Sequence, residues 1–121
     1  MVISVDKYYN SDKTEIGVLV SPGYGAGFST WYDGPNPINL AVDRRVIEYW
    51  FSHRFCRKDT MKEGEEEVSA FLETLGYHDT YCGGWYQLEF RWVPVGKSFR
   101  ITEYDGFETL LYLEDAGFTV A

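Results

Sequence analysis

The stretch WYQLEFRWVPVGKSFRITEYDGFETLLYL (residues 85–113) sets the architecture of this chain. Apolar and polar side chains alternate along 85–93 and again along 98–104, and this period of two predicts β-strands. The segments 94–97 and Asp105-Gly106 interrupt the alternation, and Asp-Gly is typical of the tight turn of a hairpin. We therefore predict a C-terminal meander of three strands, 85–93, 98–104 and 107–113, with a short final piece at 118–120.

The residues before the meander predict a hairpin and two helices. Segments 2–9 and 16–20 alternate on either side of the turn-forming cluster 10–13, which indicates a hairpin. Apolar residues recur at helical spacing along 40–54 and 62–75. The predicted fold is therefore α+β: a mostly antiparallel sheet of about five strands, made of the N-terminal hairpin and the C-terminal meander, with two helices on one face.

Composition indicates one folded domain over residues 1–121. Hydrophobic residues make up 45% of the 121 residues and aromatic residues 18%, more than a disordered chain carries. The net charge of −8 argues against direct binding of duplex DNA and is compatible with a partner that is itself basic. We find no basic leader, no apolar run of membrane length and only two cysteines, so we expect a cytoplasmic protein with reduced thiols and no membrane contact.

The irregular segment SPGYGAGFSTWYD (residues 21–33), called the glycine loop below, carries three alternating glycines, Gly23, Gly25 and Gly27. Its bare amides could approach a phosphate, which Arg44 or Arg45 could then hold. A dinucleotide fingerprint needs a helix directly after the glycines, however, and the predicted helix begins more than ten residues after the first of them. The other interpretation is a structural loop whose aromatic side chains pack on the sheet.

Aromatic residues gather in irregular segments in numbers that exceed the needs of a core of this size. The glycine loop contains Tyr24, Phe28, Trp31 and Tyr32, which are typical of anchors in a protein interface, although such rings could equally cover the core. Neighbouring acidic residues would contact a basic partner: Asp33, Glu63, Glu65, Glu66 and Glu67. Basic residues gather between the two predicted helices: Arg54, Arg57, Lys58 and Lys62. That arrangement fits either a charged partner or a helix end that needs none.

Histidine and cysteine fall into two pairs, His53-x-x-Cys56 and His78-x-x-x-Cys82. Each pair could hold one side of a tetrahedral zinc ion, and the alternatives are buried thiols and ordinary loop histidines.

We find neither a Gly-x-Ser-x-Gly elbow nor a His-Glu-x-x-His motif. The acidic pairs Glu103 with Asp105 and Glu108 with Glu114 are expected to be solvated surface rather than acid–base partners. The residues thus favour a non-enzyme, with no cofactor other than zinc to consider.

Three segments, GYGAGFSTW (23–31), LAVDRRVIEYW (40–50) and WVPVGKSFRITEYDGFE (92–108), resemble a group of uncharacterised small accessory proteins of tailed phages and prophages. The resemblance implies a protein made in the cytoplasm of an infected bacterium, and it carries no activity or site residue. Small acidic phage proteins are frequently stoichiometric inhibitors of host machinery, anti-CRISPR proteins among them.

From this setting we expect a phage-encoded inhibitor that binds a host defence or nucleic-acid-handling complex through the glycine loop and the acidic residues. Two other hypotheses stay open. One is a nucleotide- or signalling-metabolite-binding protein or hydrolase that uses the glycine loop, and the other is a structural or assembly component of the phage. The identity of the partner and the oligomeric state do not follow from the residues.

Overall fold

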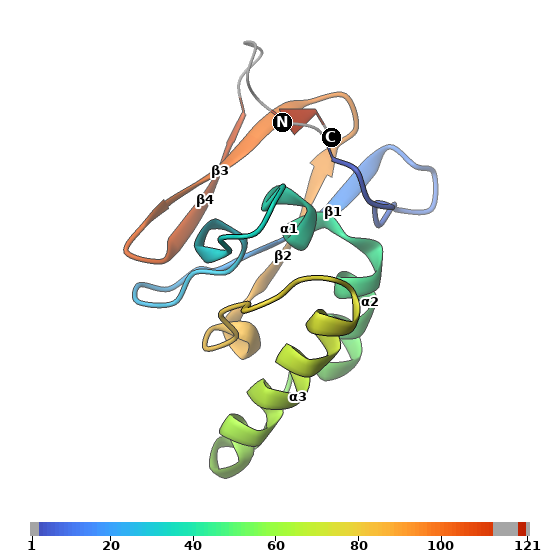
Figure 1. Ribbon diagram of the computed structural model, residues 1–121. Helices are drawn as coiled ribbons and strands as arrows, with labels where there is room; N and C mark the ends of the chain where they lie inside the picture. Colours follow the sequence, from blue (N-terminus) through green and yellow to red (C-terminus); the bar gives the residue numbers. More distant parts are fainter. Residues whose placement is uncertain (1–2, 113–118, 121) are drawn as a thin grey trace.

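The computed structural model describes residues 3–112 and 119–120, whose strands form two antiparallel sheets (Figure 1). In one sheet, β1 (Glu15–Val20) pairs with β2 (Glu89–Pro94). In the other, β3 (Ser98–Tyr104) lies between β4 (Phe107–Tyr112) and the two-residue β5 (Thr119–Val120). The predicted α+β class is confirmed, whereas the predicted single sheet of about five strands is not.

The first difference from the expected fold is the partner of β1. Residues 3–9 form no strand. The expected hairpin is reduced to one bridge between Tyr9 and Ile16 and two backbone hydrogen bonds, from the Gly17 amide to the Tyr8 carbonyl (2.8 Å) and from the Asn10 amide to the Glu15 carbonyl (3.1 Å). β1 instead pairs with β2 along its whole length. Gly17 allows this pairing because the Phe90 ring of β2 lies where a Cβ would stand.

The second difference is that the predicted meander is divided between the two sheets. β2 and β3 are consecutive in the chain but do not pair, whereas β3 and β4 form the predicted hairpin. Asp105 (φ 51°) and Gly106 (φ 89°) both have positive φ, as a tight two-residue hairpin turn requires. The predicted strand 107–113 ends, and the predicted piece 118–120 begins, at a residue that lies outside the described residues.

The helical region contains a break that the apolar period did not predict. The helix expected over residues 40–54 is divided into α1 (Ile38–Val42) and α2 (Arg44–His53) at Asp43, whose backbone is extended. The Asp43 side chain caps α2 by accepting a 2.9 Å hydrogen bond from the Arg45 amide. The second predicted helix is present as α3 (Met61–Thr74). Within the described part of the chain, no helix has both the length and the apolar content that crossing a membrane requires.

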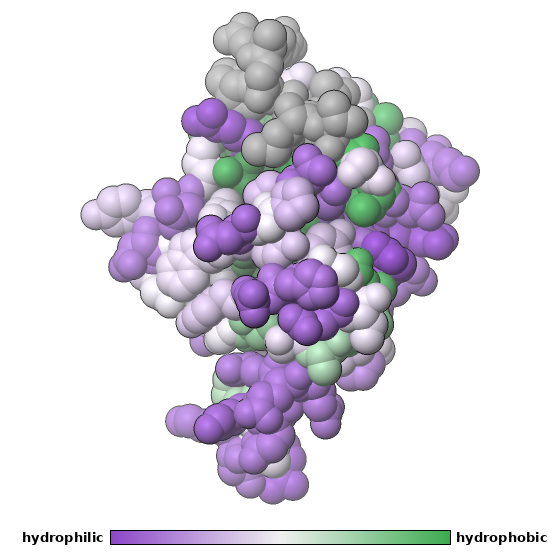
Figure 2. Space-filling view, viewed as in Figure 1, coloured by the Kyte–Doolittle hydropathy of each residue, from purple (hydrophilic) through white to green (hydrophobic). Residues whose placement is uncertain are grey.

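Two apolar clusters fill the interior. One joins α2 and α3 around Trp50, Leu72 and the fully buried Trp85. The other joins β1 to α1, β2 and β3, with Val18 and Phe99 among its members. In Figure 1, α3 projects from the sheets, and Figure 2 shows a mainly hydrophilic surface on its projecting end.

Candidate functional site

The glycine loop closes around a carboxylate of the protein itself. Glu108 on β4 is only 3% exposed. Its Oε1 accepts a hydrogen bond from the Ser21 amide (2.9 Å), and its Oε2 accepts from the amides of Phe28 (2.9 Å) and Thr30 (3.0 Å) and from the Thr30 hydroxyl (2.5 Å). Amides of the kind that bind a phosphate are therefore occupied by an internal anion.

The expectation that Glu108 is a solvated surface residue is wrong. Position 108 is two residues from the half-buried Leu110, so both side chains lie on the same face of β4, away from solvent. A carboxylate on such a face needs several donors, and the glycine loop supplies them. The strand period did not indicate the inward position of Glu108, because the opposite face of β4 carries the apolar Phe107 and Leu111. Its expected partner, residue 114, lies outside the described residues.

The turn between β3 and β4 supports the far side of the glycine loop. The Gly25 amide donates a hydrogen bond to the Asp105 carbonyl, and the Ser21 hydroxyl donates to the Ala26 carbonyl. A Cβ on Gly106 would stand 2.5 Å from the Ala26 nitrogen, so only glycine allows this close approach. Figure 1 shows the loop beside the turn.

Exposed aromatic rings cluster where the loop meets the turn. Tyr24 is 68% exposed and stacks on Phe107 with ring centroids 5.3 Å apart. Tyr104 is 77% exposed and meets the Tyr24 ring edge-on at 6.3 Å. We call Tyr24, Tyr104 and Phe107 the aromatic tip. Two of its three members come from the hairpin, where alternation alone did not distinguish them from other strand residues.

Trp31 and Tyr81 lie against each other beside this surface, with ring centroids 4.9 Å apart. The Trp31 Nε1 donates a 3.3 Å hydrogen bond to Glu103, which also accepts from the Gly106 amide at 2.9 Å. Glu103 therefore connects Trp31 to the turn that carries the aromatic tip.

The other loop residues expected at a partner surface have different positions. Phe28 and Tyr32 are buried, and their rings pack edge-on against Trp85 and Tyr77 at 5.9 and 5.8 Å. These two rings therefore belong to the core in this structure and offer no surface to a partner, whereas Asp33 is exposed. The residue types alone could not separate Tyr24 from Phe28, because burial depends on which elements cover the loop.

The acidic residues of α3 do not adjoin the aromatic tip. Glu63, Glu66 and Glu67 are exposed and Glu65 is partly buried. They lie on the N-terminal half of the projecting α3, away from the β3–β4 turn (Figure 1). The carboxylates beside the aromatic tip belong instead to Glu103 and Asp105.

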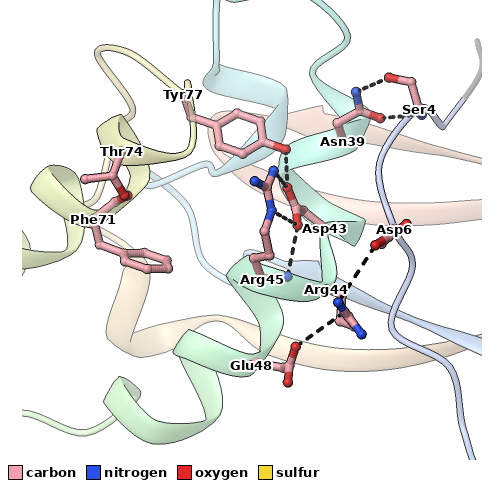
Figure 3. Close-up of polar contacts among 10 residues, drawn as sticks. All are labelled: Ser4, Asp6, Asn39, Asp43, Arg44, Arg45, Glu48, Phe71, Thr74 and Tyr77. Carbon is pink, nitrogen blue, oxygen red and sulfur yellow. Dashed lines mark hydrogen bonds and ion pairs between the residues drawn. The ribbon is translucent and has the colours of Figure 1, made fainter.

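Both arginines considered for a phosphate site already have carboxylate partners (Figure 3). Arg45 forms two hydrogen bonds to the fully buried Asp43, of 3.1 Å from Nε and 2.7 Å from Nη2. Arg44 pairs with Asp6 at 3.8 Å and with Glu48 at 3.5 Å. Of the glycine amides considered for the same site, that of Gly25 donates to the Asp105 carbonyl, so this amide and both arginines have partners within the protein. The phosphate site stays a prediction from the residue pattern.

The environment of Asp43 holds it ionised. Burial alone would raise the pKa of Asp43, but hydrogen bonds from the side chains of Arg45 and Tyr77 lower it below its ordinary value. The Tyr77 hydroxyl donates to Asp43 over 2.7 Å. Burial and this hydrogen bond raise the pKa of Tyr77 well above its usual range. The group is a structural junction: it caps α2 and connects that helix to the segment after α3.

The candidate zinc ligands occupy different environments. His53 and His78 are exposed, Cys56 is partly buried, and Cys82 is buried. Burial raises the pKa of the Cys82 thiol to about 11, which disfavours the thiolate that a metal would need. Among residues 3–112 and 119–120, no three histidine, cysteine or acidic side chains are arranged to hold a metal ion. Zinc binding stays a prediction from the spacing.

An apolar hollow of about 300 Å³ adjoins the glycine loop. Thr30 and Ser29 line it on the loop side, and Ile38, Arg100, Ile101 and Glu103 line it on the side of α1 and β3. The exposed part of the site therefore combines aromatic rings, an apolar hollow and carboxylates, which are groups that recognise another protein. Comparisons of the chain with protein-family models, with curated proteins and with solved structures give no match.

Proposed function

We propose that this protein binds another protein through the aromatic tip and thereby inhibits it stoichiometrically. The proposed target is a host defence or nucleic-acid-handling enzyme in a bacterial cytoplasm. One observation carries the proposal: the large exposed rings of Tyr24, on the glycine loop, and Tyr104, at the end of β3, meet where hydrogen bonds join that loop to Glu108 and to the β3–β4 turn. Exposed aromatic residues on a rigid support are typical of the residues that dominate binding energy in protein interfaces.

Rigidity of the loop supports this proposal energetically. Ordering a flexible loop on binding costs free energy, and a loop that is already ordered avoids that cost. Hydrogen bonds connect the glycine loop to the β3–β4 hairpin at Ser21, Gly25, Phe28 and Thr30. The rings that they support can therefore enter a partner's pocket with little further loss of entropy.

Charge favours a basic partner surface. The chain has a net charge of −8, and Glu103 and Asp105 place carboxylates beside the exposed rings. A nucleic-acid-binding channel is strongly basic, so an acidic protein is attracted to it at long range. The same charge disfavours binding of the nucleic acid itself.

The hollow beside the loop completes the proposed contact surface. Its lining is mainly apolar, and Glu103 lies at the boundary between the hollow and the Trp31 side chain. A side chain of the partner could be buried there while the aromatic tip enters the partner. Such mutual insertion is common where hot-spot residues pair across an interface.

The test uses affinity capture followed by quantitative binding. The wild-type chain and a Tyr24→Ala, Tyr104→Ala double variant are used to capture proteins from a bacterial host lysate, and each captured protein is purified and its Kd measured. Because both rings are mostly exposed, the double variant should fold normally, as circular dichroism can check. We expect its binding to weaken roughly 100-fold, the loss of two hot-spot residues.

The matched control is Tyr9→Ala, which removes an exposed tyrosine near β1. It should bind within a factor of about two of wild type, as surface substitutions away from an interface do. Titrating the activity of the captured enzyme should give complete inhibition near one equivalent of this protein. Equal Kd values for the double variant and the wild-type chain would refute the role of the aromatic tip.

A further inference from the structure

A second aromatic surface, distinct from the aromatic tip, lies at the bend between α2 and α3. Phe55 is 83% exposed, the most exposed of the large apolar side chains that the structure describes. The Arg54 guanidinium lies over three rings, with centroids 4.8 Å away for Phe55, 5.3 Å for Trp50 and 5.8 Å for Phe51. A guanidinium stacked on rings keeps its N–H groups at the edge of its plane available to an acceptor.

A hollow of about 350 Å³ opens beside this guanidinium. Trp50 and Phe55 line it from the helical side, and Leu88 and Phe90 line it from the chain leading into and along β2. Its lining therefore combines apolar and aromatic side chains with the charged Arg54 and Glu89. A ligand that fills it needs an apolar group to bury and an anion to meet the guanidinium.

Most of the basic residues at this bend have no carboxylate partner within the described part of the chain. Among the described residues, Arg54, Lys58 and Lys62 form no ion pair, whereas Arg57 pairs with Asp59 at 3.2 Å. An acidic protein could readily have placed carboxylates beside these cations, so a patch of unpaired positive charge favours a negatively charged partner.

The acidic groups around the hollow limit where such a partner can lie. Glu89 lines the hollow, but its carboxylate is held by Arg91 at 2.7 Å. Burial raises the pKa of Tyr86, which also lines the hollow, and the nearby Glu65 raises it further. Glu63 and Glu66 are exposed on the same helix as Glu65. These α3 carboxylates would repel an anion on that side. The favoured site for a negatively charged partner is therefore small and lies over Arg54 and Phe55.

We propose that this hollow binds an acidic peptide segment of a partner protein. An apolar side chain of the peptide is buried against Phe55, Trp50 and Phe90, and a neighbouring carboxylate accepts hydrogen bonds from Arg54. A nucleic acid is a poorer occupant because its continuous phosphate backbone would pass close to the α3 carboxylates. The proposal is independent of the aromatic tip and gives the protein a second docking surface.

The test uses fluorescein-labelled peptides and fluorescence anisotropy with the full chain. The probe EEEFEEE carries the anchor and the charge, EEEAEEE lacks the anchor, and KKKFKKK reverses the charge. We expect EEEFEEE to bind about tenfold more tightly than EEEAEEE, in line with burial of one aromatic side chain. KKKFKKK should show no saturable binding.

Variants connect the binding to the bend. Arg54→Gln and Phe55→Ala should each weaken EEEFEEE binding about tenfold. The matched control Arg57→Gln changes an arginine in the same bend that is already paired, and Tyr24→Ala changes the aromatic tip. Both should bind the probe as the wild-type chain does, and circular dichroism verifies the fold of every variant.

Any of the following results would overturn the proposal. The first is a failed specificity test, either equal affinity for EEEFEEE and KKKFKKK or no effect of Arg54→Gln on EEEFEEE binding. The second is that oligothymidylate binds at the bend and EEEFEEE does not, which would make the hollow a nucleic-acid site. The third is self-association in light scattering that Phe55→Ala abolishes, without peptide binding, which would make a second copy of the chain the occupant.

Discussion

Replacing Glu108 by glutamine should destabilise the whole domain as well as the loop that it holds. The glutamine carbonyl can replace Oε2 and keep the three donors from Phe28 and Thr30. Its amide nitrogen must then replace Oε1 and face the Ser21 amide, so that two donors oppose each other. One hydrogen bond is lost and three others lose their charged acceptor.

The magnitude follows from these four contacts. A hydrogen bond to a charged group contributes about 1.5–3 kcal/mol, and a neutral one about 0.5–1.5 kcal/mol. Losing one bond and weakening three therefore amounts to about 5 kcal/mol, which is comparable to the lower end of the roughly 5–15 kcal/mol that stabilises a small domain. For a chain of this length we expect the melting temperature to fall by about 20 °C.

Urea unfolding followed by tryptophan fluorescence gives the free energy of unfolding of Glu108→Gln. The control is Glu66→Gln, which neutralises an exposed glutamate on α3 and should change stability by less than about 0.5 kcal/mol. Hydrogen exchange adds a local measurement, because the amides of Phe28 and Thr30 should lose protection. If Glu108→Gln is as stable as Glu66→Gln and both amides stay protected, the proposed role of the carboxylate is refuted.

Three further substitutions or reactions test other contacts. Gly106→Ala should lower the free energy of unfolding in urea by about 2 kcal/mol more than Gly96→Ala does. Both positions have positive φ, but only at Gly106 would the new Cβ meet the loop backbone. Equal losses of stability would contradict the close approach. Because the folded-state pKa of Asp43 is lowered, its contribution to stability is present above the ordinary value of 3.8 and is lost as the pH falls through the folded-state pKa. Asp43→Asn should therefore lower the free energy of unfolding by about 2 kcal/mol near neutral pH and flatten its decline in acid, and an unchanged acid profile would exclude this role. Burial and a pKa of about 11 should protect the Cys82 thiol from iodoacetamide until the protein unfolds, so Cys56 should be labelled first. Mass spectrometry of partly labelled protein shows which cysteine reacts first, and labelling of Cys82 before Cys56 would contradict the prediction.

Local periodicity was sufficient to predict most of the secondary structure. The period of two located β3 and β4, and the Asp105-Gly106 turn was predicted from its residue types alone. It located β2 only in part, because residues 85–87 of the strand predicted over 85–93 form a 3-10 helix. The helical period located α2 and α3. The break at Asp43 was missed because an aspartate in a helical pattern also suits an exposed helix face. The contacts from distant segments at the break, between the Arg44 amide and the Asp6 carbonyl and between Tyr77 and Asp43, could not be foreseen from the local pattern.

Strand partners and the loop anchor could not be predicted from local patterns. Every apolar face can pair with several others, and β1 is buried on both faces, so alternation did not reveal that it pairs with β2. Likewise, the alternating glycines indicated a bound anion, but the amides that bind the Glu108 carboxylate belong to Ser21, Phe28 and Thr30, and Glu108 lies far along the chain. This anchor depends on tertiary structure and could not be predicted from the loop residues.

The distance along the chain between the glycine loop and its anchor also determines when the loop can form. Ser21, Phe28 and Thr30 precede Glu108 by 87, 80 and 78 residues. Contacts of such separation form slowly, because a long loop of chain must close before they contribute any stability. During synthesis the glycine loop has no internal anion to close around until residue 108 has left the ribosome. We therefore expect the surface that carries Tyr24 to be among the last parts of the protein to mature.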